Sequence, residues 1–173
     1  IIKSNGIDKF HNLLDEYSKF DSNLHNKLVS LRDKVLTESD LLKYSEELRI
    51  LERELTIFHS KAANEILEKY RKSTGENIDL IGFHGQTIYH DPKNKVSKQL
   101  GDGKLLSQLT KKNIVYNFRQ NDIKNGGQGA PLTPIFHRVL ASCYKLDLPI
   151  CILNIGGISN ITIINKLKSS SRN

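Results

Sequence analysis

Apolar residues in the first 75 positions recur every three or four residues, which is the spacing of amphipathic helices. The pattern predicts two long helices, over residues 10–36 and 40–72. Between them, the stretch "TESD" offers Thr37 or Ser39 as the N-cap of the second helix. Gly75 then follows as its expected C-cap, because glycine readily adopts the left-handed conformation that ends many helices.

The hydrophobic period changes after Gly75. Short apolar runs bounded by turn residues follow, and they alternate with segments of helical spacing. The predicted strands are 78–83, 86–90, 96–100, 113–118, 149–155 and 158–165, and the predicted helices are 103–111, capped by Asp102, and 131–146. Strands separated by helices indicate an α/β fold. Gly156-Gly157 between the last two strands predicts a hairpin.

Charge and composition narrow the classes of partner. The chain has 173 residues and a net charge of +7, and all of the excess positive charge lies beyond residue 75. A basic half could attract phosphate or nucleic acid, or it could reflect compositional drift alone, so a small anionic ligand stays open. No Arg-rich tract with interleaved aromatic residues is present, so we expect no nucleic-acid partner. No apolar run approaches the roughly 18 residues of a membrane span, so we expect no membrane partner either.

The two cysteines, Cys143 and Cys151, stand apart in apolar surroundings. This placement predicts buried thiols rather than a disulfide or a metal pair, and therefore a cytoplasmic location. The start of the chain has no apolar segment typical of a secretory signal, which agrees with that location.

Three glycine-containing motifs carry the candidate chemistry. In "GFHGQTIYH", residues 82–90, a buried strand runs into His84 and Gly85, followed by Gln86. Polar side chains at the carboxyl end of a strand are typical of ligand sites in α/β folds. A histidine that only completes the local structure is the competing interpretation.

The second motif, "NDIKNGGQGAPL", places Asp122 near the start of a glycine-rich loop after a strand. Gly126, Gly127, Gln128 and Gly129 would expose backbone N–H groups beside a helix N-terminus, and Asp122 could act there as a general base. The competing interpretation is a plain glycine turn capped by the aspartate, and the residues alone favour it.

The third motif, "LNIGGISN", sets Gly156 and Gly157 between two strands, with Asn154 and Asn160 on either side. Such a hairpin could cradle a phosphate, and it could equally be a Gly-Gly turn without a ligand.

The order of these motifs, together with "SKQLGDG", resembles the anhydro-N-acetylmuramic acid kinases over residues 40–165. The resemblance implies the actin/hexokinase/Hsp70-like ATPase fold, which is ribonuclease H-like, with most of the first lobe and the start of the second. It implies an enzyme that uses ATP and Mg²⁺ to open the 1,6-anhydro ring of anhydro-N-acetylmuramic acid and to phosphorylate O6. The product is N-acetylmuramic acid 6-phosphate, an intermediate of cell-wall recycling.

The resemblance also implies roles for individual residues. Asp122 matches the family's base, which activates the water that attacks the anomeric carbon. On the sugar side lie Gln86 and Thr87 and, in the glycine loop, Gly126, Gly127 and Gln128. Gly156, Gly157 and Asn160 match a phosphate loop of the second lobe, and no side chain is expected to bind metal directly.

Departures from the family pattern shape the expected organisation. Asn117 stands where the family usually has aspartate, and neither a G-T-S-x-D-G nor a T-G-P-G-N block occurs. We therefore expect a central fragment: an incomplete first lobe at 1–148, the first hairpin of the second at 149–165 and a frayed tail at 166–173. The alternative is a non-catalytic remnant, or one lobe of a split enzyme that is inactive alone. A homodimer or a complementing chain is open, and a small binding module for anionic sugars has little support.

Overall fold

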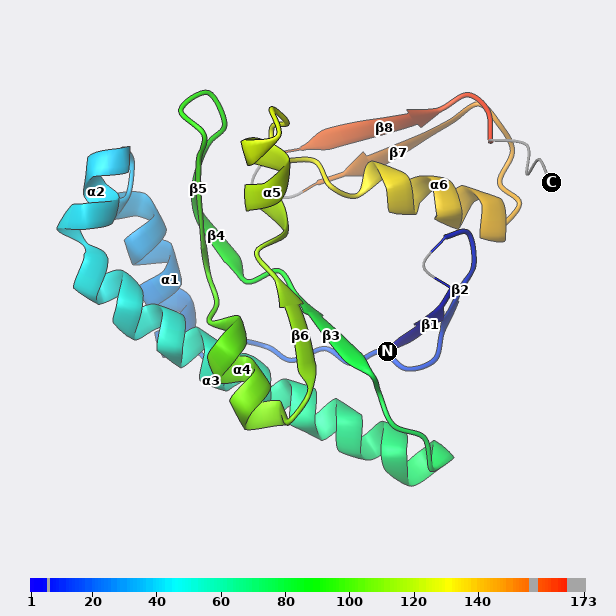
Figure 1. Ribbon diagram of the computed structural model, residues 1–173, viewed down its shortest axis with the longest axis horizontal. Helices are drawn as coiled ribbons and strands as arrows, with labels where there is room; N and C mark the ends of the chain where they lie inside the picture. The colour runs from blue at the N-terminus through cyan, green and yellow to red at the C-terminus, as the bar shows by residue number, and fades with distance from the viewer. Residues whose placement is uncertain (6, 156–158, 168–173) are drawn as a thin grey trace. The chain divides into compact units, whose positions relative to one another are not determined.

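The structure is a computed structural model that describes residues 1–5, 7–155 and 159–167 (Figure 1). It is mixed α/β and divides into two compact units. One unit is Glu16–Ala130, and the other combines Ile1–Asp15 with Pro131–Asn173. The expected boundary between residues 148 and 149 stays a prediction, and most of the expected tail lies outside the described residues.

Three helices form one side of the Glu16–Ala130 unit: α1 (Ser22–Lys34), α2 (Glu38–Lys43) and α3 (Ser45–Thr74). In Figure 1, α1 and α2 lie beside the first half of the long α3 helix. The core of the unit packs leucines of α1 and α3 against the β4–β5 hairpin described below, and its fully buried members include Leu31, Leu55 and Leu100. Each such buried side chain contributes about 1.5–3 kcal/mol through removal of apolar surface from water.

The strands of this unit form two pairs. β3 (Leu80–Phe83) runs parallel to β6 (Asn113–Tyr116), and β4 (Gln86–Asp91) runs antiparallel to β5 (Val96–Leu100). The helix α4 (Gly103–Thr110) connects β5 to β6, and the short helix α5 (Phe118–Lys124) follows β6. These elements confirm the strands that the sequence predicts between residues 78 and 118.

Polar contacts from α3 fix the connection between β5 and α4. Glu52 Oε1 accepts from the Gly101 N–H at 3.1 Å, and Thr56 Oγ1 accepts from the Asp102 N–H at 3.0 Å. The Asp102 carboxylate in turn accepts from the N–H groups of Lys104 and Leu105, which confirms it as the N-cap of α4. Side chains of α3 thus accept hydrogen bonds from the two backbone N–H groups that follow the end of β5.

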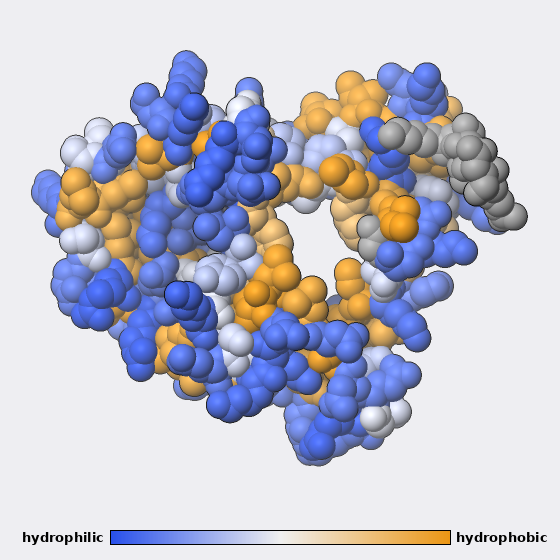
Figure 2. Space-filling view, in the orientation of Figure 1, coloured by the Kyte–Doolittle hydropathy of each residue, from blue (hydrophilic) through white to orange (hydrophobic). Residues whose placement is uncertain are grey.

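The other unit contains two hairpins and one helix: β1 (Ile2–Ser4) with β2 (Phe10–Asn12), β7 (Ile150–Asn154) with β8 (Asn160–Ile164), and α6 (Pro134–Cys143). The β7–β8 pair is antiparallel, as the sequence predicts. His137 of α6 hydrogen-bonds Thr162 Oγ1 of β8 at 2.8 Å. On the hairpin's other face Leu153, Ile161 and Ile163 are more than half exposed, and Figure 2 shows hydrophobic residues over this hairpin.

Four expectations require correction. The predicted helix 10–36 begins only at Ser22, and residues 13–21 belong to no helix or strand. Residues 10–12 form a strand, because Phe10 pairs with Ser4 across a turn in which Asn5 Oδ1 accepts three backbone N–H groups. The predicted helix 40–72 is interrupted at Tyr44, with α2 before it and α3 after it. Thr37 is the N-cap of α2. The expected loop after β6 contains α5, and both cysteines are exposed rather than buried.

Candidate functional site

The glycine loop begins with a short helix. β6 ends at Tyr116, and Asn117 adopts a left-handed conformation with φ 61° that turns the chain into α5. Asparagine and aspartate both tolerate this conformation better than most residues, so it does not explain the replacement of the family's aspartate. Asp122 lies in the last turn of α5, and its carbonyl accepts from the Gly127 N–H at 2.8 Å, which closes the loop back on the helix.

The Asp122 carboxylate is exposed and is held by the loop that follows it. Its Oδ2 accepts a hydrogen bond of 2.7 Å from the Gly129 N–H. A Cβ atom at Gly127 would lie 2.2 Å from the same oxygen and 2.4 Å from the carboxyl carbon. Because glycine has no side chain, the Asp122 carboxylate can occupy the space beside the Gly127 backbone. This geometry orients one oxygen of a carboxylate that is otherwise exposed.

Gly129 is needed for a different reason. Its φ is 68°, and an added Cβ would lie 2.8 Å from the side chain of Ile123, which is buried. Arg119 Nη1 donates to the Gly129 carbonyl at 2.6 Å. Both ends of the Gly129 backbone are thus bound to α5, the N–H by Asp122 and the carbonyl by Arg119.

The β4–β5 hairpin supports α5 from a second direction. Gln120 Nε2 donates to the Ser97 carbonyl at 2.6 Å, and Gln99 Nε2 donates to Ser97 Oγ at 2.8 Å. His90 Nδ1 and the same Ser97 Oγ are 2.9 Å apart. Burial and the charge of Arg119 lower the pKa of His90, and a hydrogen bond to the backbone of Gln128 opposes part of this change.

The H-G-Q-T segment lies at the start of β4. Gly85, with φ 65°, passes so close to β5 that a Cβ would lie 2.1 Å from the Leu100 carbonyl oxygen. Gln86 is exposed and pairs with Leu100, and the half-buried Thr87 pairs with Gln99. These two side chains therefore stand where β4 begins.

A cleft of about 280 Å³ adjoins these elements. Its lining includes His84 and Gly85 before β4, Gln99 and Gly101 on and after β5, and Gln120 on α5. The lining includes neither Asp122 nor Gln86. Sequence reasoning missed Gln120 and His90, although His90 closes the quoted "GFHGQTIYH" motif.

The expected phosphate loop is described only in part. Gly156 and Gly157 lie outside the described residues. Asn160, the first residue of β8, pairs with Asn154, and its Oδ1 is buried without a hydrogen-bond partner in the part of the chain that the structure describes. A buried acceptor of this kind is costly unless a donor reaches it.

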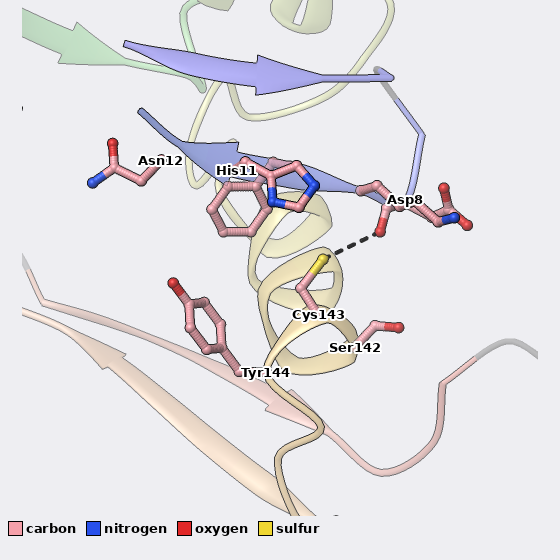
Figure 3. Close-up of a pocket in the computed structure, with 8 residues that line it drawn as sticks. Asp8, His11, Asn12, Ser142, Cys143 and Tyr144 are labelled. Atoms are coloured by element: carbon pink, nitrogen blue, oxygen red, sulfur yellow. Dashed lines mark hydrogen bonds between the residues drawn. The ribbon is translucent and has the colours of Figure 1, made fainter. Parts of the chain in front are cut away.

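The unit that contains the two termini has a pocket of its own, of about 510 Å³ (Figure 3). Residues of the β1–β2 hairpin and the end of α6 line it, and Cys143 Sγ donates to the Asp8 carbonyl at 3.3 Å. In Figure 3, His11 and Tyr144 border this space from opposite sides. None of the predicted site residues lines it.

The described residues lack two further features. Within residues 1–5, 7–155 and 159–167, no cluster of three His, Cys, Asp or Glu side chains could hold a metal ion. No helix in that same part of the chain has the length and hydrophobicity needed to cross a membrane.

Together the fold and the loop define a mixed α/β protein in which a backbone-anchored carboxylate stands in a glycine-rich loop beside a strand-end cleft. The family described as anhydro-N-acetylmuramic acid kinase has a sequence model that matches residues 6–170, and the chain belongs to this family.

Individual relatives support the same family assignment. The chain is 50% identical over 164 residues to the anhydro-N-acetylmuramic acid kinase of Pelagibacter ubique, a match that covers 95% of this chain and 43% of the relative. It is 44% identical over 114 residues to the enzyme of the same name from Rhodopseudomonas palustris, covering 66% of this chain and 31% of that relative. A third, from Brucella canis, is 45% identical over 121 residues, 69% of this chain and 32% of the relative. The chain thus spans less than half the length of these relatives.

Proposed function

We propose that this chain supplies the sugar-activating part of an ATP-dependent kinase that opens the ring of anhydro-N-acetylmuramic acid and phosphorylates its O6. The observation that carries the proposal is the Asp122 carboxylate, which is fixed by the Gly129 N–H in a loop that has no room for a side chain at Gly127. A base with one oxygen anchored and one free is suited to orient a water molecule.

In this mechanism Asp122 takes a proton from the water as the water's oxygen bonds to the anomeric carbon. The bond between that carbon and O6 breaks, and O6 becomes the acceptor of the γ-phosphoryl group of ATP. The anomeric carbon gains positive character as the bond to O6 breaks, so a well-oriented weak base is sufficient. Gln86 and Thr87, with the loop residues Gly126, Gly127 and Gln128, would bind the sugar.

ATP would be held by the actin-like fold that the family implies, with Gly156, Gly157 and Asn160 on its phosphates. Among the described residues Asn160 Oδ1 is buried and has no hydrogen-bond donor, so it could accept one from a ligand or from the adjoining Gly156-Gly157 segment. The Mg²⁺ that accompanies ATP would be bound by phosphate oxygens and water. It would neutralise the charge that develops on the transferred group.

The test is a chimera in which residues 6–170 replace the matching segment of the Pelagibacter ubique relative. We expect the chimera to form phosphorylated sugar from ATP and anhydro-N-acetylmuramic acid, and its Asp122→Asn variant to lose turnover by about 10³-fold or more while still binding the sugar. An Asp122→Asn chimera with substantial activity would show that another residue is the base. A well-folded but inactive chimera would favour the alternative, a non-catalytic remnant.

A further inference from the structure

The strand-end cleft contains two glutamine side chains that are held by one buried serine. Gln120 Nε2 donates to the Ser97 carbonyl at 2.6 Å, and Gln99 Nε2 donates to Ser97 Oγ at 2.8 Å. All three residues line the cleft. Because a carbonyl oxygen can only accept hydrogen bonds, the Gln120 amide must turn its nitrogen toward Ser97 and its oxygen away from that carbonyl.

Each of the two amides keeps an oxygen that the protein does not use. Neither Gln99 Oε1 nor Gln120 Oε1 hydrogen-bonds another group in the part of the chain that the structure describes. Both side chains are half-buried. A half-buried acceptor that is already held in one orientation gains most from a ligand that brings an O–H or N–H group to it.

Charge and size restrict what such a ligand can be. Among the described residues that line the cleft, Lys98 is the only lysine or arginine, and its Nζ is 3.0 Å from Glu52 Oε1. The Lys98 charge is therefore balanced within the protein. The volume of about 280 Å³ lies at the lower end for ligand pockets, so one sugar ring fits and a nucleotide does not. These features favour the uncharged, donor-bearing face of a single sugar.

We propose that this cleft is a subsite for the bridged sugar, in which the amide oxygens of Gln99 and Gln120 accept hydrogen bonds from the acetamido N–H at C2 and the hydroxyl at C4. The proposal rests on the proposed function for the identity of the sugar, and it adds two specificity-determining side chains to the residues assigned there. In anhydro-N-acetylmuramic acid the bridge uses O1 and O6, and O3 carries the lactyl ether. The C2 and C4 groups are therefore its only hydrogen-bond donors at neutral pH.

The bridge also determines where these two donors point. It holds the ring in an inverted chair, in which the C2 and C4 substituents are axial on the same face. In the ring-opened sugar both substituents are equatorial and point away from each other. Two acceptors anchored on one serine are suited to the first arrangement, because both bonds can form at once. We therefore expect the cleft to discriminate between the bridged substrate and the opened product.

The first test is nuclear magnetic resonance on the 173-residue chain, with the sugar as the only ligand and without ATP. We expect the side-chain amide resonances of Gln99 and Gln120 to shift as anhydro-N-acetylmuramic acid is added. The resonances of Gln108, which is exposed on α4 and outside the cleft lining, are the control and should not move. N-Acetylmuramic acid should bind about tenfold more weakly, because only one of the two hydrogen bonds can form.

The second test pairs each side chain with a group of the sugar. The parent chain should bind the bridged sugar about five- to tenfold more tightly than its 4-deoxy analogue. Either Gln99→Met or Gln120→Met should lose this preference, because one of them removes the acceptor for the C4 hydroxyl while keeping the length of the side chain. Gln108→Met is the matched control and should retain it. A glutamine with a purely structural role would weaken the binding of both sugars equally.

Two results would overturn the proposal: side-chain amide resonances of Gln99 and Gln120 that ignore the sugar, or a parental preference for the 4-hydroxyl sugar in both methionine variants. The resonance measurement needs only the parent chain, so it decides the matter even if a variant fails to fold. An inactive chimera, together with a preference that one methionine variant loses, would instead refute the proposed reaction and leave the subsite in place.

Discussion

Gly127→Ala offers a sharp test of the Asp122 loop, because the structure shows what the new methyl group would meet. The added carbon would lie 2.2 Å from Asp122 Oδ2, 2.4 Å from the carboxyl carbon and 2.5 Å from Oδ1. Ordinary contact between such atoms begins near 3.5 Å, so the carboxylate must move by about 1 Å. Rotating the side chain away relieves the contact only by breaking the 2.7 Å hydrogen bond from the Gly129 N–H.

The expected consequences differ for stability and for catalysis. Asp122 is exposed, so loss of its hydrogen bond should lower the free energy of unfolding by only about 1 kcal/mol. Displacement of a reacting group by about 1 Å, by contrast, can lower turnover about 100-fold. We therefore expect a chimera with Gly127→Ala to melt near the parent temperature and to lose about two orders of magnitude in kcat.

Gly126→Ala is the matched control. Gly126 has φ 88°, so alanine there is strained by about 1–2 kcal/mol, but no atom lies within 4 Å of the added carbon. The two variants should therefore lose similar stability, while only Gly127→Ala lowers kcat, and any effect of Gly126→Ala on sugar binding falls on KM. Urea unfolding and steady-state assays on both proteins measure the two effects. Parent-like turnover in Gly127→Ala, or an equal loss in Gly126→Ala, would refute the assigned role of the carboxylate.

Three further variants test how the surrounding structure is held. Gly85→Ala should lower the free energy of unfolding by about 3 kcal/mol, since a left-handed residue would meet the Leu100 carbonyl at 2.1 Å; parent-like urea unfolding would contradict this. Asp102→Ala should cost about 1 kcal/mol by removing the N-cap of α4, and Asp102→Asn should restore most of it. Burial lowers the pKa of His59, so its contribution to stability is complete above the ordinary histidine pKa and is lost as the pH falls below it. His59→Asn should accordingly weaken the fall in urea midpoint between about pH 7 and pH 5, and an unchanged slope would refute it.

Most elements of the Glu16–Ala130 unit were predictable because their signals are local. The apolar run at 80–83 is bounded by turn residues, Gly75 ends α3 with φ 73°, and Asp102 caps α4. The helix α5 was not predictable, since its seven residues are too few to establish a period and only Ile123 among them is buried. Phe10 was wrongly assigned to a helix because its spacing continues the helical pattern of apolar residues. The Asn5-Gly6 turn signal that precedes it favours the hairpin that forms.

In the candidate site, too, features that depend on neighbouring residues were predictable, and features that depend on distant residues were not. Three glycines after an aspartate are visible in the sequence, and they predicted a loop able to bind the carboxylate or an anion. The reason for Gly127 in particular is a contact with Asp122, and it emerges only when α5 turns the aspartate back over the loop. Gln120 shows the limit more clearly, because its side chain donates to the Ser97 carbonyl of β5, a contact that exists only once α5 has formed beside that strand. A contact between two elements leaves no short-range pattern in the sequence, so it follows from coordinates and not from spacing.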